Sequence, residues 1–299
     1  MKKFIVILAG GEGKRLRHKT GKDCPKQFFR ATPDEQNMLE MTFARLQNLK
    51  MRVGGHVVTV IKEKNHAALN ACQFKGANNV VFEPETCKNT APAIFNTICS
   101  FAKEYGESLF AFFPVDHKVD DETYFTNLLT RVMRLAEKVN KLFLLGSPTS
   151  SINSQLGYIV PKRSDVIVEG AEVYPLQAFV EKPDEAKIME LVPQNPLVNM
   201  GVFIGKASVF LEAFIKVAYG AREDGQTLTG DSFDREILPS VLEQVLVFEY
   251  KSTWSDCGMA TQILGDEQVT TDDLQDLAED TVVPAAASKQ EASIKQMEV

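Results

Sequence analysis

The chain has 299 residues, of which 44% are hydrophobic and 24% are charged, as in ordinary soluble globular proteins. Its formal net charge of −7 is concentrated in residues 266–299, which hold nine acidic and two basic residues. The other 265 residues carry 31 residues of each sign and therefore have no net charge. Because nucleic-acid binding needs a basic surface, this charge distribution argues against nucleic acid as the main partner.

The sequence also disfavours membrane and secreted classes. No apolar run approaches the roughly 20 residues that a membrane-spanning helix needs, so we expect no membrane partner. The first apolar stretch is short and runs into Gly10-Gly11, which favours a buried strand over a signal peptide. Cysteines without paired spacing favour a reducing, cytoplasmic location and no zinc site. These cysteines are Cys24, Cys72, Cys87, Cys99 and Cys257.

The first two-thirds of the chain alternates short apolar runs with longer amphipathic stretches. The predicted strands are Phe4–Leu8, His56–Ile61, Asn79–Phe82, Leu109–Phe113 and Leu142–Leu145. The predicted helices are Met38–Leu49, Asn65–Phe74, Ala91–Tyr105 and Asp121–Val139. This alternation predicts an α/β fold with a mainly parallel central sheet that helices cover on both faces.

After Gly146 the pattern becomes richer in strands, which indicates a second, smaller lobe built over the same sheet. The predicted strands are residues 157–160, Val166–Val168, Val173–Glu181 and Val198–Gly205. The predicted helices are Asp184–Leu191, with Pro183 in its first turn, and Ala207–Tyr219. No linker separates the lobes, so we predict one domain over residues 1–265. Residues 266–299 are predicted to form an acidic, weakly structured tail.

A glycine-rich loop follows the first predicted strand, with the sequence Ala9-Gly10-Gly11-Glu12-Gly13-Lys14-Arg15-Leu16. Glycines at such a turn let backbone N–H groups approach a phosphate closely. Two common phosphate loops do not match. The dinucleotide-binding fingerprint needs glycine where Leu16 stands, and the P-loop needs serine or threonine where Arg15 stands.

This loop, followed by Pro25-Lys26-Gln27-Phe28, resembles the signature of sugar-1-phosphate nucleotidyltransferases, and of the mannose-1-phosphate guanylyltransferase branch in particular. The resemblance implies a Rossmann-like nucleotide-diphospho-sugar transferase fold. Its nucleotide-binding part would span about residues 1–146 and its sugar-binding lobe about 147–265. It also implies that Arg15 and Lys26 neutralise the phosphates of the nucleotide. The loop residues that would wrap the nucleoside triphosphate are Ala9, Gly10, Gly11 and Gly13.

A second block runs from Glu83 to Ile94 and includes Asn89-Thr90-Ala91-Pro92. Thr90 is predicted to cap a helix with Pro92 in its first turn, and a helix N-terminus offers unpaired N–H groups to an anion or a base edge. The block resembles the guanylyltransferase pattern, with Lys88 where that pattern usually has arginine. The resemblance favours guanine and implies nucleotide binding by Glu83, Asn89, Thr90 and Pro92.

Two aspartates are candidates for metal binding. Asp116 follows the predicted strand Leu109–Phe113, at the sheet edge where open α/β folds place their ligands. Trp254-Ser255-Asp256-Cys257-Gly258 resembles a late Trp-x-Asp-x-Gly block of the family. The resemblance implies that Asp116 and Asp256 bind Mg²⁺, which accepts a few carboxylates together with phosphate oxygens and water. His117 is predicted to support the loop rather than to react.

Three motifs of the second lobe resemble family elements that contact the hexose phosphate. They are Gly157-Tyr158, Glu181-Lys182-Pro183 and Asn199-x-Gly201. The resemblance implies that Lys182 grips the sugar phosphate. The other implied sugar-binding residues are Gly157, Tyr158, Glu181, Asn199 and Gly201. Val198 stands where the family often has tryptophan, and Asp234 matches a family position for which we predict no role.

The resemblance predicts an enzyme that transfers a guanylyl group from GTP to mannose-1-phosphate, giving GDP-mannose and pyrophosphate. The attacking phosphate is already anionic, so no nucleophilic side chain is required. Catalysis would rest on positioning and charge neutralisation by Arg15, Lys26, Asp116 and Lys182. The alternatives are thymidylyl, uridylyl or cytidylyl transfer to a glucose-type sugar, and a non-catalytic paralogue that binds nucleotide-sugar. A homodimer is one assembly that the sequence permits.

Overall fold

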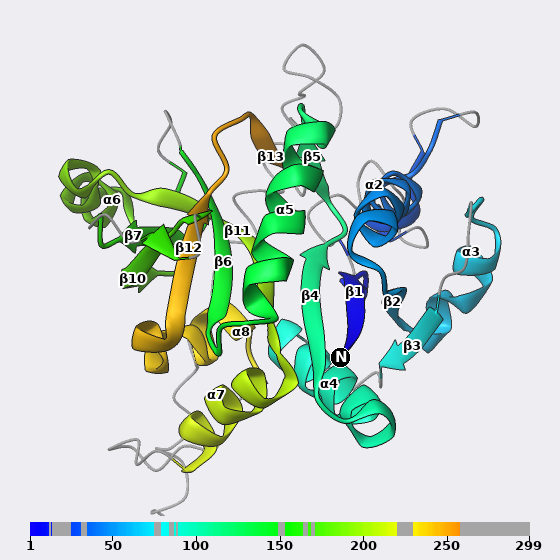
Figure 1. The fold of residues 1–299 in the computed structure, drawn as a ribbon. Coiled ribbons are helices and arrows are strands. Elements are labelled where there is room, and N and C mark those ends of the chain that lie inside the picture. Colours follow the sequence, from blue (N-terminus) through cyan, green and yellow to red (C-terminus); the bar gives the residue numbers. More distant parts are fainter. Residues whose placement is uncertain are drawn as a thin grey trace, which may run out of the picture.

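A nine-stranded sheet forms the centre of the protein (Figure 1). This computed structural model describes residues 1–11, 13, 25–30, 35–74, 79–83, 87, 89–148, 153–163, 167–168, 171–219 and 230–257. The strand order is β3-β2-β1-β4-β11-β6-β12-β10-β7. The strands are β1 (Lys2–Leu8), β2 (His56–Lys62), β3 (Asn79–Glu83), β4 (Ser108–Pro114), β6 (Leu142–Pro148), β7 (Tyr158–Pro161), β10 (Tyr174–Val180), β11 (Leu197–Lys206) and β12 (Val245–Glu249).

Most strands of this sheet run in one direction, so the predicted α/β class with a mainly parallel sheet is confirmed. Parallel pairing joins β3, β2, β1 and β4, and it also joins β6 to β12. The strands β10 and β11 run the opposite way and pair antiparallel with their neighbours. Because β11 lies between β4 and β6 and also pairs with β7, strands from both predicted lobes share one sheet. The predicted tail, residues 266–299, lies outside the described residues.

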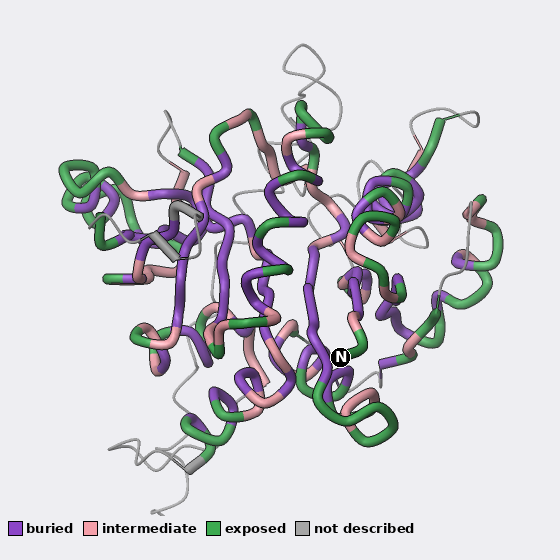
Figure 2. The backbone as a smooth tube through the Cα atoms, in the orientation of Figure 1, coloured by how far each residue is buried: buried purple, intermediate pink, exposed green. Residues whose placement is uncertain are grey.

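Helices cover both faces of the sheet. In β1 the side chains of Ile5 and Ile7 join a core under α2 (Met38–Val53) and α5 (Glu122–Ala136). The side chains of Phe4 and Val6 join a core under α4 (Thr90–Tyr105) and α7 (Ala207–Tyr219). This alternation follows from the two-residue period of a strand. Figure 2 shows the central strands as buried and the outer sides of the helices as exposed. The α-helices are α2 (Met38–Val53), α3 (His66–Asn70), α4 (Thr90–Tyr105), α5 (Glu122–Ala136), α6 (Glu185–Leu191), α7 (Ala207–Tyr219) and α8 (Phe233–Glu236).

Short elements complete the described part of the chain. Two small antiparallel sheets pair β5 (His117–Val119) with β13 (Trp254–Asp256), and β8 (Ile167–Val168) with β9 (Ala171–Glu172). The 3-10 helices are η2 (Lys26–Phe28), η3 (Glu63–Asn65), η4 (Val192–Gln194), η5 (Leu238–Ser240) and η6 (Leu242–Gln244). The strand β12, which lies inside the sheet between β6 and β10, was not predicted from the sequence.

Three local predictions are wrong, each because a tertiary or capping contact decides the boundary. The predicted helix Asn65–Phe74 is shorter, since α3 ends at Asn70, and beyond it the N–H of Gln73 bonds to the Glu40 carboxylate. Pro183 lies before α6 rather than in its first turn, because Asp184 caps that helix by accepting from the Lys187 N–H at 2.8 Å. Thr90 begins α4 and does not cap it; the capping position belongs to Asn89.

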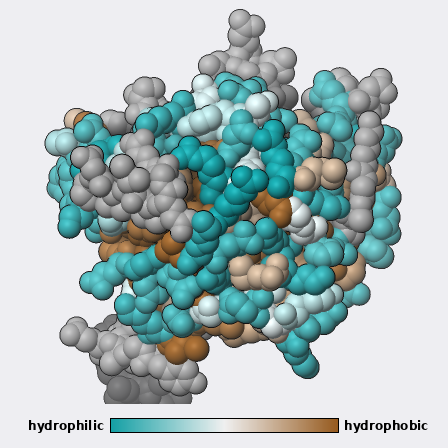
Figure 3. All heavy atoms as spheres, viewed as in Figure 1, coloured by the Kyte–Doolittle hydropathy of each residue, from teal (hydrophilic) through white to brown (hydrophobic). Residues whose placement is uncertain are grey.

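In the part of the chain that the structure describes, the face of the molecule drawn in Figure 3 is mainly hydrophilic. Figure 3 shows one face on which hydrophobic atoms emerge in small patches between hydrophilic ones. Among the described residues, no helix has both the length and the apolar character that crossing a membrane requires.

Candidate active site

An ion pair between Lys26 and Asp116 lies at the end of β4. Asp116 occupies the turn between β4 and β5, and Lys26 begins η2, 90 residues earlier in the chain. Both side chains are mostly buried, with 15% and 13% of their surface exposed. Burial opposes the charged form of Asp116, but the Lys26 ammonium beside it holds the pKa of this carboxyl below its ordinary value. The sheet edge therefore presents a cation and a carboxylate together.

The second predicted metal ligand, Asp256, is brought to the same turn by the small sheet of β5 and β13. Asp256 is the register partner of His117, and the N–H of Cys257 donates to the carbonyl oxygen of Asp116 at 2.8 Å. Two aspartates on adjacent backbone segments are a donor set that suits Mg²⁺ when phosphate oxygens and water complete the shell. Within the described residues, no three potential His, Cys, Asp or Glu ligands gather into a group.

His117 packs its ring edge-on against Trp254, with the ring centroids 5.2 Å apart. Burial lowers the pKa of His117 to about 4, so the imidazole is neutral at physiological pH. The predicted supporting role of His117 stays a prediction.

Two glycines of the first loop make room for other predicted site residues. A Cβ atom on Gly10 would lie 1.5 Å from Oε1 of Glu83, and a Cβ atom on Gly13 would lie 2.7 Å from Cβ of Lys26. Gly13 also has a φ of +62°, a conformation that side chains disfavour. The loop thus packs directly on Glu83, at the end of β3, and on Lys26.

The start of the loop is fixed by a buried glutamine. The side-chain amide of Gln27 donates to the carbonyl oxygen of Ala9 at 2.7 Å, and the N–H of Ala9 donates to the Val60 carbonyl at 2.9 Å. Gly11 is exposed, and a Cβ atom there would meet nothing within 4 Å. Arg15, the other predicted phosphate-binding residue of the loop, lies outside the described residues.

The predicted nucleotide block contacts the segment before and within α8. The Thr90 hydroxyl oxygen accepts from the Phe233 N–H at 2.9 Å, which explains why it does not cap its own helix. The Asn89 amide donates to the Gly230 carbonyl at 3.3 Å, and the Ala91 N–H donates to the Asp231 carbonyl at 3.3 Å. Pro92 is in the first turn of α4, as predicted.

The sugar motifs gather around Glu181. A Cβ atom on Gly157 would lie 2.7 Å from Oε2 of Glu181, and the Asn199 N–H donates to the Gly157 carbonyl at 2.8 Å. Burial raises the pKa of Glu181, while the positive charges of Lys182 and Arg235 oppose that rise. Lys182 is exposed and has a φ of +46°, a strained conformation of the kind that often marks functional sites.

Tyr158 lies in the same region but has a buried side chain. Its hydroxyl accepts from the Asn153 N–H at 3.0 Å and lies 3.2 Å from the Asn153 carbonyl. The ring belongs to a small core under α6. Any contact between Tyr158 and a sugar would therefore have to come from its backbone.

Gly201 joins the sugar motifs to the Lys26–Asp116 pair. Its N–H donates to the side-chain oxygen of Asn199 at 3.0 Å, and a Cβ atom on Gly201 would lie 3.1 Å from Pro114, the last residue of β4. The φ of Gly201 is +62°, so glycine suits this turn both in conformation and in space. The turn that holds Asn199 and Gly201 therefore lies beside the end of β4, two residues before Asp116.

Comparison with known protein families matches residues 4–273 to the nucleotidyl transferase family. The chain belongs to this family. Two curated relatives are each 32% identical to it over 71% of its length: the alginate biosynthesis protein AlgA of Pseudomonas aeruginosa and a mannose-1-phosphate guanylyltransferase of Salmonella muenchen. The chain spans 43% and 44% of those two proteins.

A solved structure supports the same assignment. The crystal structure described as a mannose-1-phosphate geranyltransferase from Thermus thermophilus is 25% identical, with a TM-score of 0.71 over 87% of this chain and 77% of that one. The family resemblance of the sequence motifs is thus confirmed.

One polar residue of this nucleotidyl transferase has a place in the site that we did not predict. Asp234, in α8, accepts from the Asn199 side-chain amide at 2.6 Å. Both ends of the Asn199 amide are therefore engaged, and its orientation is set by Asp234 and Gly201. The sequence signal was the match of Asp234 to a family position, but its partner lies 35 residues earlier in the chain.

Asp234 should make stability depend on pH. Burial and the nearby negative charge of Glu181 raise the pKa of Asp234 from 3.8 to about 7, against the opposing hydrogen bond from Asn199. Between pH 4 and 7 the folded state keeps a proton that the unfolded state releases, so rising pH lowers the free energy of unfolding. Above about pH 7 this contribution no longer changes.

We expect Asp234→Asn to remove this decrease in the free energy of unfolding between pH 4 and 7. Thermal unfolding followed by circular dichroism should show the variant's Tm, relative to the wild type, increasing as the pH rises from 5 to 8. A difference in Tm that stays constant over this range would contradict the assignment.

Proposed function

We propose that this protein transfers a guanylyl group from GTP to mannose-1-phosphate, releasing pyrophosphate and forming GDP-mannose. The observation that carries the proposal is that two groups of residues lie on or beside the neighbouring strands β4 and β11, where Gly201 packs against Pro114. One group holds the glycine loop, Lys26 and Asp116, and the other holds Glu181 and Asn199. The first group suits a polyanionic nucleotide, and the second suits the hydroxyl groups of a sugar.

In this proposal the chain's own residues act by binding and charge neutralisation. Lys26 and Arg15 stabilise the negative charge that develops on the leaving pyrophosphate, and Lys182 holds the sugar phosphate for in-line attack. Glu181 accepts hydrogen bonds from sugar hydroxyls, and Asn199 contributes a further polar contact. Mg²⁺ held by Asp116 and Asp256 would supply neutralisation of phosphate charge.

Guanine and mannose are proposed because of sequence similarity to guanylyltransferases. The Asn89-Thr90-Ala91-Pro92 block resembles the guanylyltransferase pattern, and one relative at 32% identity is named a mannose-1-phosphate guanylyltransferase. Val198, in place of a frequent tryptophan, leaves a glucose-type sugar with another nucleotide as the second candidate. A cytoplasmic location and a homodimer stay predictions.

The purified chain should be incubated with Mg²⁺, each of the nucleoside triphosphates and a panel of sugar-1-phosphates, and pyrophosphate release measured. We expect the highest kcat/KM for GTP with mannose-1-phosphate. A preference for another pair would overturn the substrate assignment but retain the reaction class. Nucleotide-sugar binding without pyrophosphate release from any pair would instead identify a non-catalytic paralogue.

A further inference from the structure

Three buried polar residues of α2 lie next to the segments that carry Lys26 and Asp116. Glu40, Thr42 and Arg45 are only 2%, 2% and 6% exposed, although they lie on a helix whose other buried residues are mainly apolar. Burying such groups costs free energy unless they are hydrogen-bonded. All three side chains form hydrogen bonds with residues outside α2.

Two of these residues hold the turn that carries Asp116. The Thr42 hydroxyl donates to the carbonyl oxygen of Val115 at 2.9 Å, and the Arg45 guanidinium donates to the carbonyl oxygen of His117 at 3.1 Å. These carbonyls belong to the residues immediately before and after Asp116. The turn is therefore fixed on both sides of the carboxylate by one helix.

Arg45 also connects this turn to α5. Its Nε atom pairs with Oε1 of Glu122 at 3.1 Å, and Glu122 is the first residue of that helix. Because the planar guanidinium makes both contacts at once, its own orientation is restrained.

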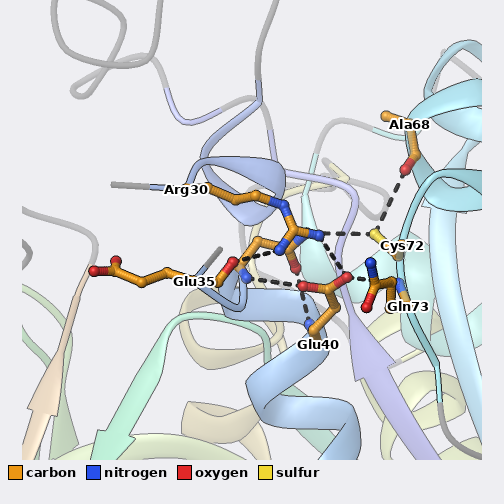
Figure 4. A network of polar contacts seen from close by, with 7 residues as sticks. Arg30, Glu35, Glu40, Ala68, Cys72 and Gln73 are labelled. Atoms are coloured by element: carbon orange, nitrogen blue, oxygen red, sulfur yellow. Dashed lines mark hydrogen bonds and ion pairs between the residues drawn. The ribbon is translucent and has the colours of Figure 1, made fainter. Parts of the chain in front are cut away.

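The third residue, Glu40, anchors the segment that carries Lys26. Its carboxylate accepts from Arg30 at 2.6 Å, from the Gln73 N–H at 2.6 Å and from the Asn37 N–H at 3.0 Å. Figure 4 shows the side chains of Arg30 and Glu40 directed toward each other beside Gln73. Burial opposes ionisation of Glu40, yet the pKa is lowered because these hydrogen bonds favour the carboxylate.

We propose that α2 is the support that sets the position of Lys26 relative to Asp116, with Glu40, Thr42 and Arg45 as positioning residues. The inference rests on the proposed function. In the proposed complex the nucleotide phosphates would pair with Lys26, and Asp116 would serve Mg²⁺, so the Lys26–Asp116 ion pair alone would not fix the two side chains. The contacts from α2 involve neither of these two charged groups, so substrate binding does not have to break them.

The test compares two buried threonines. Thr42→Val removes the hydrogen bond to Val115, whereas Thr130→Val in α5 removes an equivalent bond, at 2.7 Å, to the carbonyl of Thr126 in its own helix. Both variants lose a buried hydroxyl, but only the first touches the Asp116 turn. Thr42→Ser keeps the hydroxyl and serves as the conservative rescue.

Amide hydrogen exchange and pyrophosphate release are measured under conditions in which the wild type and the variants are folded to the same extent. In the substrate-free protein, amide hydrogen exchange should rise in peptides covering residues 113–119 for Thr42→Val and stay unchanged for Thr130→Val. In pyrophosphate release, Thr42→Val should lower kcat by about tenfold, since small misplacements of reacting groups have effects of this order. Thr42→Ser should resemble the wild type in both assays.

A second variant tests the other anchor. Glu40→Gln keeps the size of the side chain but removes its charge, so we expect faster exchange over residues 25–30 and a higher KM for the nucleoside triphosphate. Equal effects of Thr42→Val and Thr130→Val, or unchanged exchange and kcat in Thr42→Val, would overturn the proposal. If the wild type released no pyrophosphate, the proposed function would fail, and the exchange comparison would still decide whether α2 supports the turn.

Discussion

Asp116→Asn is expected to lower kcat by about 10²- to 10³-fold, which is the size of the effect when an enzyme loses a preorganised charge-stabilising group. Asp116 combines two roles in our proposal, because it is one of two carboxylates for Mg²⁺ and it pairs with Lys26. Asparagine keeps the shape of the side chain but carries no charge. The measurement is steady-state pyrophosphate release with GTP and mannose-1-phosphate at saturating Mg²⁺.

The matched control is Asp184→Asn. Asp184 is an exposed aspartate that caps α6, and asparagine caps helices equally well, so this variant should retain wild-type kcat. Asp256→Asn should resemble Asp116→Asn. Near-normal turnover by Asp116→Ala at ordinary magnesium concentrations would refute the assignment of this residue.

Lys26→Met should lower kcat/KM for the nucleoside triphosphate by about 10²-fold or more. The substitution keeps much of the length of the side chain but removes the ammonium that we propose stabilises the leaving pyrophosphate. Since Lys26 is mostly buried, its charge is weakly screened by solvent, and its loss should matter more than the loss of a surface lysine. Initial rates at varied GTP and fixed mannose-1-phosphate measure the effect.

Lys187→Met provides the control for Lys26→Met. Lys187 also forms an ion pair, with Glu190 at 2.7 Å, but the pair lies on the surface of α6 and its lysine side chain is 49% exposed. Surface pairs of this kind contribute little, so the control should show wild-type kinetics. If Lys26→Met and Lys187→Met had the same kcat/KM as the wild type, Lys26 would have no part in phosphate binding.

Short apolar runs and amphipathic stretches predicted much of the first half of the fold, because a continuous apolar run indicates a strand buried on both faces and a period of 3.6 indicates a helix with one buried face. Phe4–Leu8, for example, lies within β1, and Ala91–Tyr105 lies within α4. The missed strand β12 is different. Its five residues lie inside the sheet beside β6 and β10, and this placement depends on partners distant in sequence.

The local motifs likewise predicted which residues belong to the candidate site but not how they are held. Asp234 was recognised as a family position, yet its contact with Asn199 depends on α8 packing beside β11. Thr42 and Arg45 belong to no recognisable sequence motif. From the sequence of an amphipathic helix alone, a threonine that is buried in the fold cannot be distinguished from one on the surface.

The sequence by itself determined the α/β class, the order of the family motifs and the types of side chain available for a polyanionic substrate. Those properties follow from local periodicity and from residue chemistry, which need no knowledge of distant partners. Only the tertiary structure decided that α2 holds both sides of the Asp116 turn and that Asp234 orients Asn199. These contacts join segments 35 to 73 residues apart, and the folded sheet alone brings them within hydrogen-bonding distance.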